Sequence, residues 1–279
     1  MKAMGTEKLI QVDVEKVIAS KNPKLLKRIP RFVIRYLKRI VHQDDINDFL
    51  SRHGHKKGLD FVDAIISDFN IKIETYGEEN IPTTGRFIFA SNHPMGGLES
   101  NAFMQVVAKH YRNIKFPVND IIMNLTPLHN ILIPVNKHGA QNRDAVRKLE
   151  EEFAGDNQIL FFPAGLVSRK IKGKITDLEW KKTFVSKAIE HKRDIIVVYI
   201  HGKNSRFFYN LANCRKFFGI KANIEMLYLV NEAYKQYNRT IKIVFSKPIP
   251  WQELKEKDNA KIWAKRLKEK CYELADLLK

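Results

Sequence analysis

One short segment of the sequence combines a histidine, two glycines and a carboxylate. His93 follows the apolar run 87–90 and precedes Gly96, Gly97 and Glu99. An imidazole titrates near neutral pH and suits proton transfer to or from a hydroxyl. A carboxylate on the far ring nitrogen would fix the tautomer and stabilise the charged ring, as in a catalytic triad. The spacing does not place the two side chains on one helix face, so their contact requires a turn, which the glycines permit. The alternative is an ordinary loop histidine.

Two further strand-like segments end in polar residues. The first, residues 131–135, is followed by a turn that contains Lys137. The second, residues 159–162, leads into a basic turn. The residues of interest after it are Pro163, Gly165, Ser168, Arg169 and Lys170. The last three offer a hydroxyl and two cations, which can bind an anion through charge-assisted hydrogen bonds. The alternative is a solvated basic turn.

Residues 92–99 resemble the histidine–acid box of the glycerolipid (lysophospholipid) acyltransferase superfamily. The form of this box is similar to that of the hemolysin-like branch, which includes ornithine- and glycine-lipid O-acyltransferases. The resemblance implies that His93 is the base that deprotonates the acceptor hydroxyl and that Glu99 orients it. Two departures stand out: the acid is Glu where the family usually has Asp, and five residues separate the pair where four are commoner.

The resemblance continues over about residues 70–250 and assigns further residues. Lys137 stands where the family usually carries Arg, and Ala164 replaces the Glu of the Phe-Pro-Glu-Gly box. The implied substrate-binding residues are Asn92, Gly96, Gly97, Lys137, Phe162, Pro163, Gly165, Ser168, Arg169 and Lys170. The implied reaction moves a fatty acyl group from acyl-CoA or acyl carrier protein to the hydroxyl of a lysolipid. The acceptor would be a lyso-aminolipid of the N-acyl glycine or ornithine type, or lysophosphatidic acid. No bound cofactor and no metal are expected.

Strand-like and helix-like segments alternate beyond residue 70. The expected strands cover residues 71–76, 86–90, 114–118, 131–135, 158–162, 194–200 and 240–245. The expected helices lie near residues 100–111, 143–153, 179–190, 207–217, 222–237 and 259–278. This order predicts an α/β fold with a central, mostly parallel sheet flanked by helices. In such sheets functional residues gather at the carboxyl ends of strands, where the three polar segments lie.

Residues 1–70 are predicted to form a helical leader, and residues 71–279 an α/β acyltransferase domain. Within the leader, residues 24–41 place apolar side chains at helical spacing and carry cations without any acid. Pro30 is expected to kink this helix or divide it. Such a helix can lie in a lipid interface or simply pack on the body. Residues 206–218 also interleave aromatics with cations, which is typical of core, of an interfacial anchor or of a base-stacking surface.

The composition predicts an anionic partner. The 279 residues include 49 Lys and Arg against 31 Asp and Glu, a net charge of +18. An anionic membrane surface is the expected partner, beside the acyl donor and the lysolipid acceptor. Nucleic acid is not expected, because no RNA- or DNA-binding signature occurs. Without a signal sequence or a long apolar run, the protein is expected in the cytoplasm, peripheral on the inner face of the cell membrane. The rival hypothesis is a non-catalytic basic membrane- or RNA-binding protein on an acyltransferase scaffold.

Overall fold

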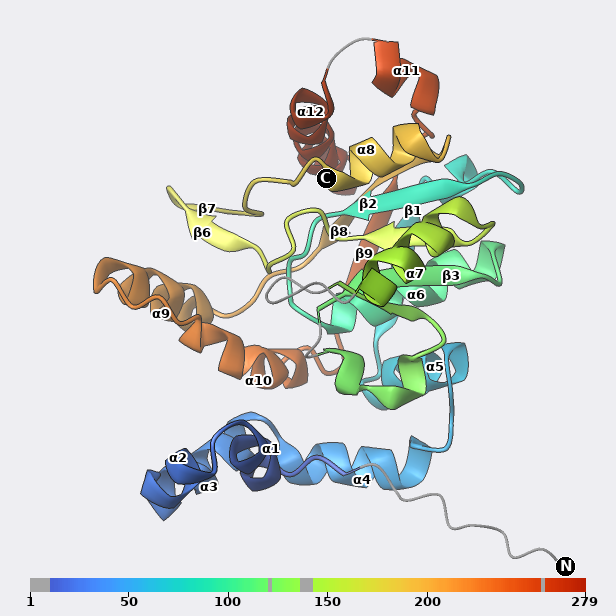
Figure 1. The fold of residues 1–279 in the computed structure, drawn as a ribbon. Helices are drawn as coiled ribbons and strands as arrows, with labels where there is room; N and C mark the ends of the chain where they lie inside the picture. Colours follow the sequence, from blue (N-terminus) through green and yellow to red (C-terminus); the bar gives the residue numbers. More distant parts are fainter. Residues whose placement is uncertain (1–10, 120–121, 136–142, 257–258) are drawn as a thin grey trace, which may run out of the picture.

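A central sheet of seven strands runs through the computed structural model, which describes residues 11–119, 122–135, 143–256 and 259–279 (Figure 1). The spatial order is β1-β9-β8-β2-β5-β3-β4. The strands are β1 Lys72–Tyr76, β2 Phe87–Ser91, β3 Ile114–Val118, β4 Leu132–Pro134, β5 Gln158–Phe161, β8 Asp194–His201 and β9 Thr240–Phe245. All seven predicted strands are present, and their ends differ from the prediction by no more than one residue.

Five neighbouring strands, β8, β2, β5, β3 and β4, are parallel to one another. β9 pairs with β8 in the antiparallel sense, and β1 is parallel to β9. The predicted mostly parallel sheet is confirmed, but the reversed β1–β9 pair was not predicted. It follows from the β8–β9 connection, which stays beyond the carboxyl end of β8 and does not cross a face of the sheet (Figure 1).

Helices flank the sheet and precede it. The α-helices are α1 Val14–Lys21, α2 Pro23–Arg28, α3 Arg31–Ile40, α4 Gln43–His53, α5 Leu59–Asp68, α6 Leu98–His110, α7 Arg143–Ala154, α8 Thr183–Glu190, α9 Arg206–Phe217, α10 Leu229–Tyr234, α11 Trp251–Glu256 and α12 Ala260–Glu273. Short 3-10 helices are η1 Glu78–Asn80, η2 Ile122–Asn124, η3 Thr126–Leu128, η4 Ile224–Tyr228 and η5 Leu274–Leu278. The helix predicted near 222–237 is therefore η4 followed by α10. A small antiparallel hairpin of β6 Arg169–Ile171 and β7 Lys174–Thr176 was not predicted.

The central strand β2 is buried on both faces. Phe87 and Phe89 belong to the core that α5 and α6 cover, while Ile88 and Ala90 belong to the core that α8 and α12 cover. This division follows from the alternation of side chains along a strand. A strand enclosed in this way is a rigid base for the residues that follow its last position.

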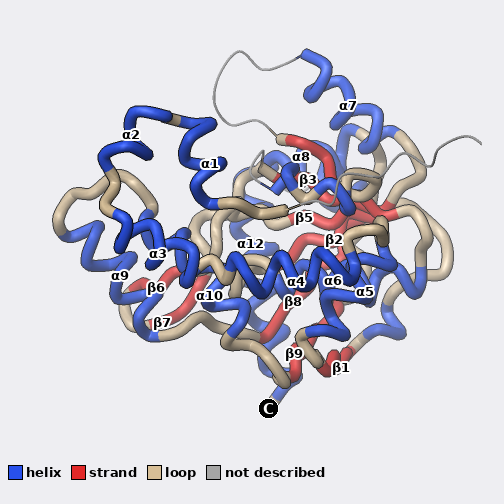
Figure 2. Tube along the Cα trace, turned by 90° about the horizontal axis from the view of Figure 1, so that it is seen from below, coloured by secondary structure: helices blue, strands red, loops and turns tan. Residues whose placement is uncertain are grey.

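The N-terminal helices form the predicted helical segment. Pro30 divides the predicted helix into α2 and α3, because its ring is tolerated at a helix start but not inside one. Asp44 and Asp45 occupy the first turn of α4, where the helix dipole favours acids. Seen from below, α1, α2 and α3 lie at one side of the molecule, beside α9 (Figure 2).

Candidate active site

His93 lies just beyond the carboxyl end of β2. The neighbouring parallel strands β5 and β8 end at Phe161 and His201, so their carboxyl ends share the same edge of the sheet. The chain turns after His93 and enters α6 at Leu98. A fixed strand end and a helix start thus hold the two sides of this turn.

The predicted contact between His93 and Glu99 is present. Nδ1 of His93 lies 2.9 Å from Oε1 of Glu99. The side chain of Glu99 is fully buried, and that of His93 is 17% exposed. The turn wraps around the carboxylate: the backbone N–H groups of Met95, Gly96 and Gly97 donate to it at 2.8, 2.7 and 2.8 Å. Gly96 and Gly97, which the resemblance implied bind substrate, thus donate their backbone N–H groups to the carboxylate of Glu99 in this structure.

The environment of Glu99 keeps this carboxyl ionised. Burial by itself raises the pKa of Glu99, but the hydrogen bond and charge of His93 and the N–H groups of Gly96 and Gly97 outweigh it and lower the pKa to about 2. An ionised carboxylate only accepts hydrogen bonds, so Nδ1 of His93 carries the proton. The lone pair of the neutral ring then lies on Nε2, which can accept a proton.

Gly96 is required by its backbone and by its neighbours. Its φ of +96° is one that L side chains rarely adopt. A Cβ on this residue would lie 2.6 Å from Cδ2 of Leu229 and 3.0 Å from Cγ2 of Val167. The absence of a side chain at Gly96 therefore lets the turn pack closely against α10 and against the segment before β6.

Phe162 stacks on the ring of His93. The two centroids are 4.1 Å apart and the rings are inclined by 18°. Phe162 follows β5 and also contacts Phe103 and Phe116, with centroids 6.2 and 5.0 Å away. These contacts fix one face of the imidazole, so Phe162 positions the histidine.

Ser168 and Asp177 hold the main chain of His93. The backbone N–H of Ser168 donates to the carbonyl oxygen of His93 at 2.7 Å, and its hydroxyl donates to Oδ1 of Asp177 at 2.5 Å. The same Oδ1 accepts from the backbone N–H of His93 at 3.2 Å, and Oδ2 accepts from Nε1 of Trp180 at 2.9 Å. Asp177 is fully buried and was not predicted. Its carboxylate connects the main chain of His93 to Ser168 and Trp180 and so fixes the start of the turn.

Ser168, Arg169 and Lys170 do not converge on one point. The guanidinium of Arg169 is buried and donates to Oε1 of Glu225 at 2.9 Å, and Nε of Arg215 donates to Oε2 of the same carboxylate at 2.5 Å. Burial lowers the pKa of Arg169 against the opposing charge of Glu225. Lys170, next along β6, is exposed, as the alternation of a strand requires. The structure thus separates the cations that the sequence groups together.

The other predicted residues serve the scaffold or fall outside the described residues. The side-chain amide of Asn92 is buried and bonds both the N–H and the C=O of Ile200, which ties β2 to β8. Pro163 is buried, and its carbonyl accepts from the N–H of Lys181. Gly165 has a φ of +62°, and its N–H donates to the carbonyl of Phe162. Lys137 lies outside the described residues.

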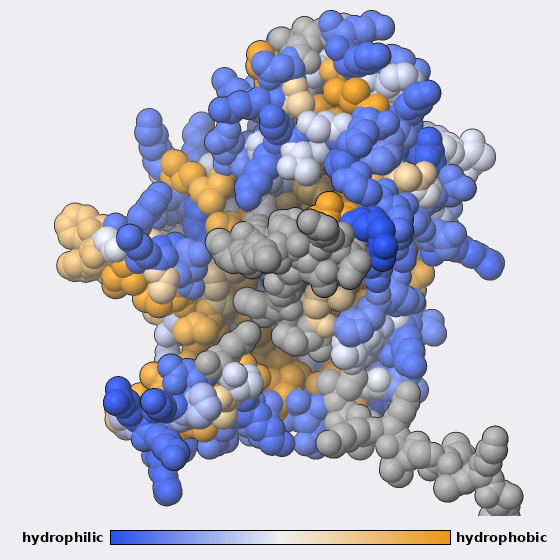
Figure 3. All heavy atoms as spheres, viewed as in Figure 1, coloured by the Kyte–Doolittle hydropathy of each residue, from blue (hydrophilic) through white to orange (hydrophobic). Residues whose placement is uncertain are grey.

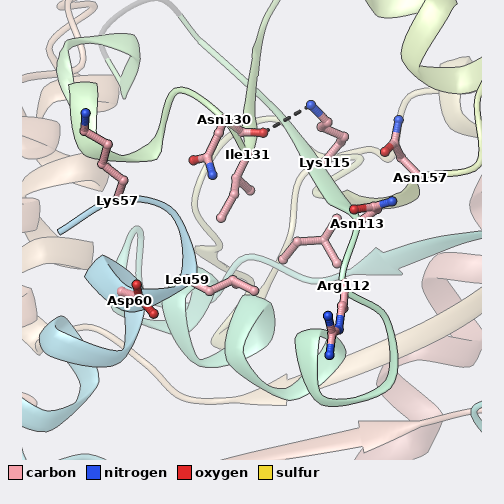
Figure 4. Close-up of a pocket in the computed structure, with 10 residues that line it drawn as sticks. Lys57, Leu59, Asp60, Arg112, Asn113, Lys115, Asn130, Ile131 and Asn157 are labelled. Atoms are coloured by element: carbon pink, nitrogen blue, oxygen red, sulfur yellow. Dashed lines mark hydrogen bonds between the residues drawn. The ribbon is translucent and has the colours of Figure 1, made fainter.

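Of two cavities in the described part of the chain, one lies far from His93 and the other lies beside the segments that support it. One of about 430 Å³ is lined by Lys57, Arg112 and Ile131 among others (Figure 4). It lies at the amino ends of β3, β4 and β5, at the edge of the sheet opposite His93. Another of about 410 Å³ lies beside Ala164 and Trp180, next to the segments that position His93.

The second cavity combines an apolar wall with cations. Leu166, Leu178 and Trp180 supply apolar surface, and the exposed Lys181, Lys182 and Lys261 stand at its rim with one acid, Glu179. Nζ of Lys261 lies 3.8 Å from that acid, which leaves the rim positive in balance. Such a cavity suits a ligand with an apolar part and a phosphate.

Among the described residues, one group could in principle ligate a metal ion: Glu150, Glu190 and His191. Nζ of Lys187 lies 2.5 Å from Glu150 and 2.7 Å from Glu190. This ammonium forms ion pairs with both carboxylates, and Nε2 of His191 lies 3.2 Å from Glu150, so the group is an ion-pair network of the surface.

Comparisons with known proteins point to one family. A family model described as acyltransferase matches residues 16–279. Curated proteins named lyso-glycine lipid O-acyltransferase, from Bacteroides thetaiotaomicron and Phocaeicola vulgatus, are each 46% identical over 272 residues. The matches cover 97% of this chain and 100% and 98% of those proteins. A solved 1-acyl-sn-glycerophosphate (LPA) acyltransferase, PlsC from Thermotoga maritima, aligns with a TM-score of 0.49 and 16% identity over 95% of this chain and 94% of that one.

Proposed function

This chain belongs to the acyltransferase family, and we propose that within it the protein O-acylates a lyso-glycine lipid from a thioester donor. Family membership confirms the resemblance predicted from residues 92–99 and extends it from residue 70 back to residue 16. It also favours an enzyme over the non-catalytic rival. The observation that carries the proposal is the 2.9 Å contact of His93 with Glu99, which leaves Nε2 to accept a proton.

The proposed reaction is a single acyl transfer. Nε2 of His93 removes the proton of the acceptor hydroxyl while the hydroxyl oxygen attacks the thioester carbonyl carbon. Glu99 stabilises the imidazolium that forms, as the acid of a triad does. The tetrahedral intermediate then collapses, the carbon–sulfur bond breaks, and the leaving thiolate takes the proton from Nε2. The products are an ester and a free thiol, and the histidine returns to its neutral state.

The acceptor is proposed from the relatives and from the chemistry of the head group. Relatives that are 46% identical over nearly the whole chain are named for a lyso-glycine lipid. The glycine end of such a lipid carries a carboxylate, which requires a cation. Because Arg169 is already paired with Glu225, we propose that Lys137 and Lys170 bind the head group and that Arg169 has a structural role. Lysophosphatidic acid is the alternative acceptor.

The donor is proposed to be acyl-CoA or acyl carrier protein. Both present the thioester on a phosphopantetheine arm, which is apolar in part and carries phosphate. The cavity beside Ala164 and Trp180 has an apolar wall and a lysine rim of that character. This cavity is linked to His93 through Asp177. The carboxylate of Asp177 accepts from Nε1 of Trp180, which lines the cavity, and from the backbone N–H of His93.

We propose that the enzyme acts at an anionic membrane surface, on the inner face of the cell membrane. None of the described helices is both long and apolar enough to cross a bilayer. The leader offers exposed cations at Arg28, Arg31 and Arg35, and these can contact anionic head groups. Lys38 is paired with Glu15 at 2.5 Å and is a weaker candidate.

Acyl transfer by the purified protein tests the proposal. Labelled acyl-CoA and acyl carrier protein would be incubated with lyso-glycine lipid and with lysophosphatidic acid, and the diacylated product would be quantified. His93→Ala should abolish product formation. His110→Ala is a matched control, because His110 lies 2.8 Å from Glu78 in a second histidine–glutamate pair, at the other end of α6. Near-normal turnover in His93→Ala, or no product from the unmodified protein with any of these substrates, would refute the mechanism.

A further inference from the structure

The far end of α9 exposes aromatic side chains at the edge of the molecule. Phe217 is 86% exposed, Phe218 68% and Ile220 43%. α9 projects from the body at the left of Figure 1, and Figure 3 shows apolar residues gathered along it. The two phenylalanine rings contact one another, with centroids 5.2 Å apart. An exposed apolar group of this size on a projecting element marks an interaction surface.

The backbone of this tip is fixed without help from the aromatic rings. The N–H of Ile220 donates to the carbonyl of Arg215, and the N–H of Gly219 donates to the carbonyl of Lys216. Gly219 has a φ of +68°, which completes a Schellman cap at the end of the helix. Arg215 also pairs with the buried Glu225. The tip therefore holds the backbone of both phenylalanines in a defined position, although the fold does not bury their rings.

The charge around the tip has one sign. Lys216 and Lys221 flank the exposed rings and are themselves exposed. Over residues 202–224 the sequence contains no Asp or Glu. Glu225, which follows, is fully buried in its pairs with arginines. Aromatic rings next to uncompensated cations suit an anionic lipid interface, where the rings enter the acyl boundary and the cations stay at the head groups.

The tip and the leader face the same side of the molecule. α9 and α1–α3 lie together at the left in both Figure 1 and Figure 2. Phe32 of α3 is 67% exposed. The hydroxyl of Tyr36 lies 2.7 Å from that of Tyr228, whose ring packs on Phe207 of α9 with centroids 4.9 Å apart. α3 and the start of α9 are therefore connected through Tyr228 of η4, and both helices expose aromatic side chains.

We propose that the α9–η4 turn, residues 214–221, is a second membrane contact that inserts Phe217 and Phe218 into an anionic bilayer. Only the reason for such a contact rests on the proposed function: two contacts would fix the orientation on the bilayer of an enzyme that takes a lipid acceptor. A protein partner needs a complementary surface of about 600–1,000 Å² on each side. A narrow tip with two projecting rings suits a lipid surface, which needs no matching shape.

Vesicle binding tests the inference without any substrate. The full chain and a Phe217→Ser/Phe218→Ser variant would be sedimented with vesicles of phosphatidylglycerol and phosphatidylcholine. We expect the variant to bind at least about tenfold more weakly, because two aromatic side chains no longer leave water. Leu277→Ser is the matched control, since Leu277 is 61% exposed but lies near the C-terminus, and its binding should equal that of the unmodified chain.

The natural cysteines offer a direct measurement of insertion. Cys214 is exposed on α9, three positions before Phe217, whereas Cys271 is buried. An environment-sensitive fluorophore on Cys214 should brighten and shift to the blue on anionic vesicles, and much less so in the double variant. Equal vesicle binding by both proteins would overturn the inference. So would a dimer that the double substitution dissociates in the absence of lipid, because that result assigns the tip to a second copy of the chain.

These measurements separate the two proposals. Loss of vesicle binding in the double variant supports the membrane contact even if no lysolipid is acylated. Acylation of lyso-glycine lipid with unchanged vesicle binding supports the proposed function and refutes the second contact.

Discussion

Replacing Glu99 with Gln tests the centre of the proposed mechanism with a minimal change of shape. In the structure Oε1 of Glu99 accepts from Nδ1 of His93 and from two backbone N–H groups, while Oε2 accepts from the N–H of Gly97 at 2.8 Å. An amide has one acceptor oxygen. If that oxygen takes the place of Oε1, the imidazole keeps its tautomer, and the new NH₂ group faces the N–H of Gly97. The variant therefore removes the charge and creates one donor–donor contact.

The magnitude follows from the hydrogen bond that loses its charge. A hydrogen bond to a charged group is worth roughly 1.5–3 kcal/mol and a neutral one roughly 0.5–1.5 kcal/mol. Since the imidazolium forms only during the reaction, the difference should appear in kcat. The two ranges differ by about 1–1.5 kcal/mol, so we expect kcat for Glu99→Gln to fall by about 5- to 15-fold, with little change in the KM of either substrate. Initial rates with labelled acyl donor measure both quantities.

The same substitution has a signature in stability. Lowering the pKa of Glu99 from 4.5 to about 2 corresponds to about 3 kcal/mol of stabilisation, because each tenfold change in the proton equilibrium is worth about 1.4 kcal/mol. The folded-state pKa is the lower one, so this stabilisation is complete above about pH 4.5 and is lost as the pH falls toward 2. Chemical denaturation of Glu99→Gln should therefore show a deficit at pH 7 that shrinks below pH 4.5.

A control variant separates charge from position. Glu99→Asp keeps the charge and shortens the side chain by one methylene, so the carboxylate can no longer reach all four donors. Its kcat should fall as well, but its pH-dependent stability should stay closer to that of the unmodified chain. If Glu99→Gln keeps a kcat within twofold of normal and shows no deficit at pH 7, the carboxylate does not support the imidazole and the reasoning is wrong.

Three other changes test a support of His93, the stability of the fold and the donor cavity. Phe162→Ala removes the ring stacked on His93 and should lower kcat about tenfold in initial-rate assays, with an unchanged circular dichroism spectrum. Arg193→Met removes a buried guanidinium that donates to carbonyl groups at the end of α7 and in the turn beyond it, and should cost about 3 kcal/mol of unfolding free energy in a denaturant titration. Reversing the charges of Lys181 and Lys182 to Glu should raise the KM of acyl-CoA and leave that of the lysolipid unchanged. Each is contradicted by a value equal to that of the unmodified chain.

The strands of the fold could be predicted because their apolar runs are short, rich in β-branched or aromatic residues, and bounded by turns. Residues 195–200 and 87–90 are examples, and both are central strands. The direction of β9 could not be predicted, since it depends on where the chain between β8 and β9 travels. The sequence of residues 202–239 predicts helices, but it does not predict where these helices lie relative to the sheet.

The centre of the site could be predicted, and its supports could not. The pairing of His93 with Glu99 is local, and the glycines between them signal the turn. Asp177 and Glu225 come from segments far along the chain, and a single carboxylate in a basic stretch resembles any solvated acid. For Arg169 the sequence predicted a substrate-binding cation. In the structure its guanidinium is buried beside Glu225 and pairs with that carboxylate.

The replacement of the family's usual Glu by Ala at position 164 fits the packing around it. Ala164 is buried in the core that contains Trp180 and Phe184, where a carboxylate would need its own buried partners. The buried carboxylate of this region is instead Asp177, whose two oxygens accept from the N–H of His93, the hydroxyl of Ser168 and the indole of Trp180. Because those donors belong to the turn and to the wall of the lysine-rimmed cavity, Asp177 couples the position of His93 to the proposed donor site. The change at 164 is therefore compatible with an intact active site.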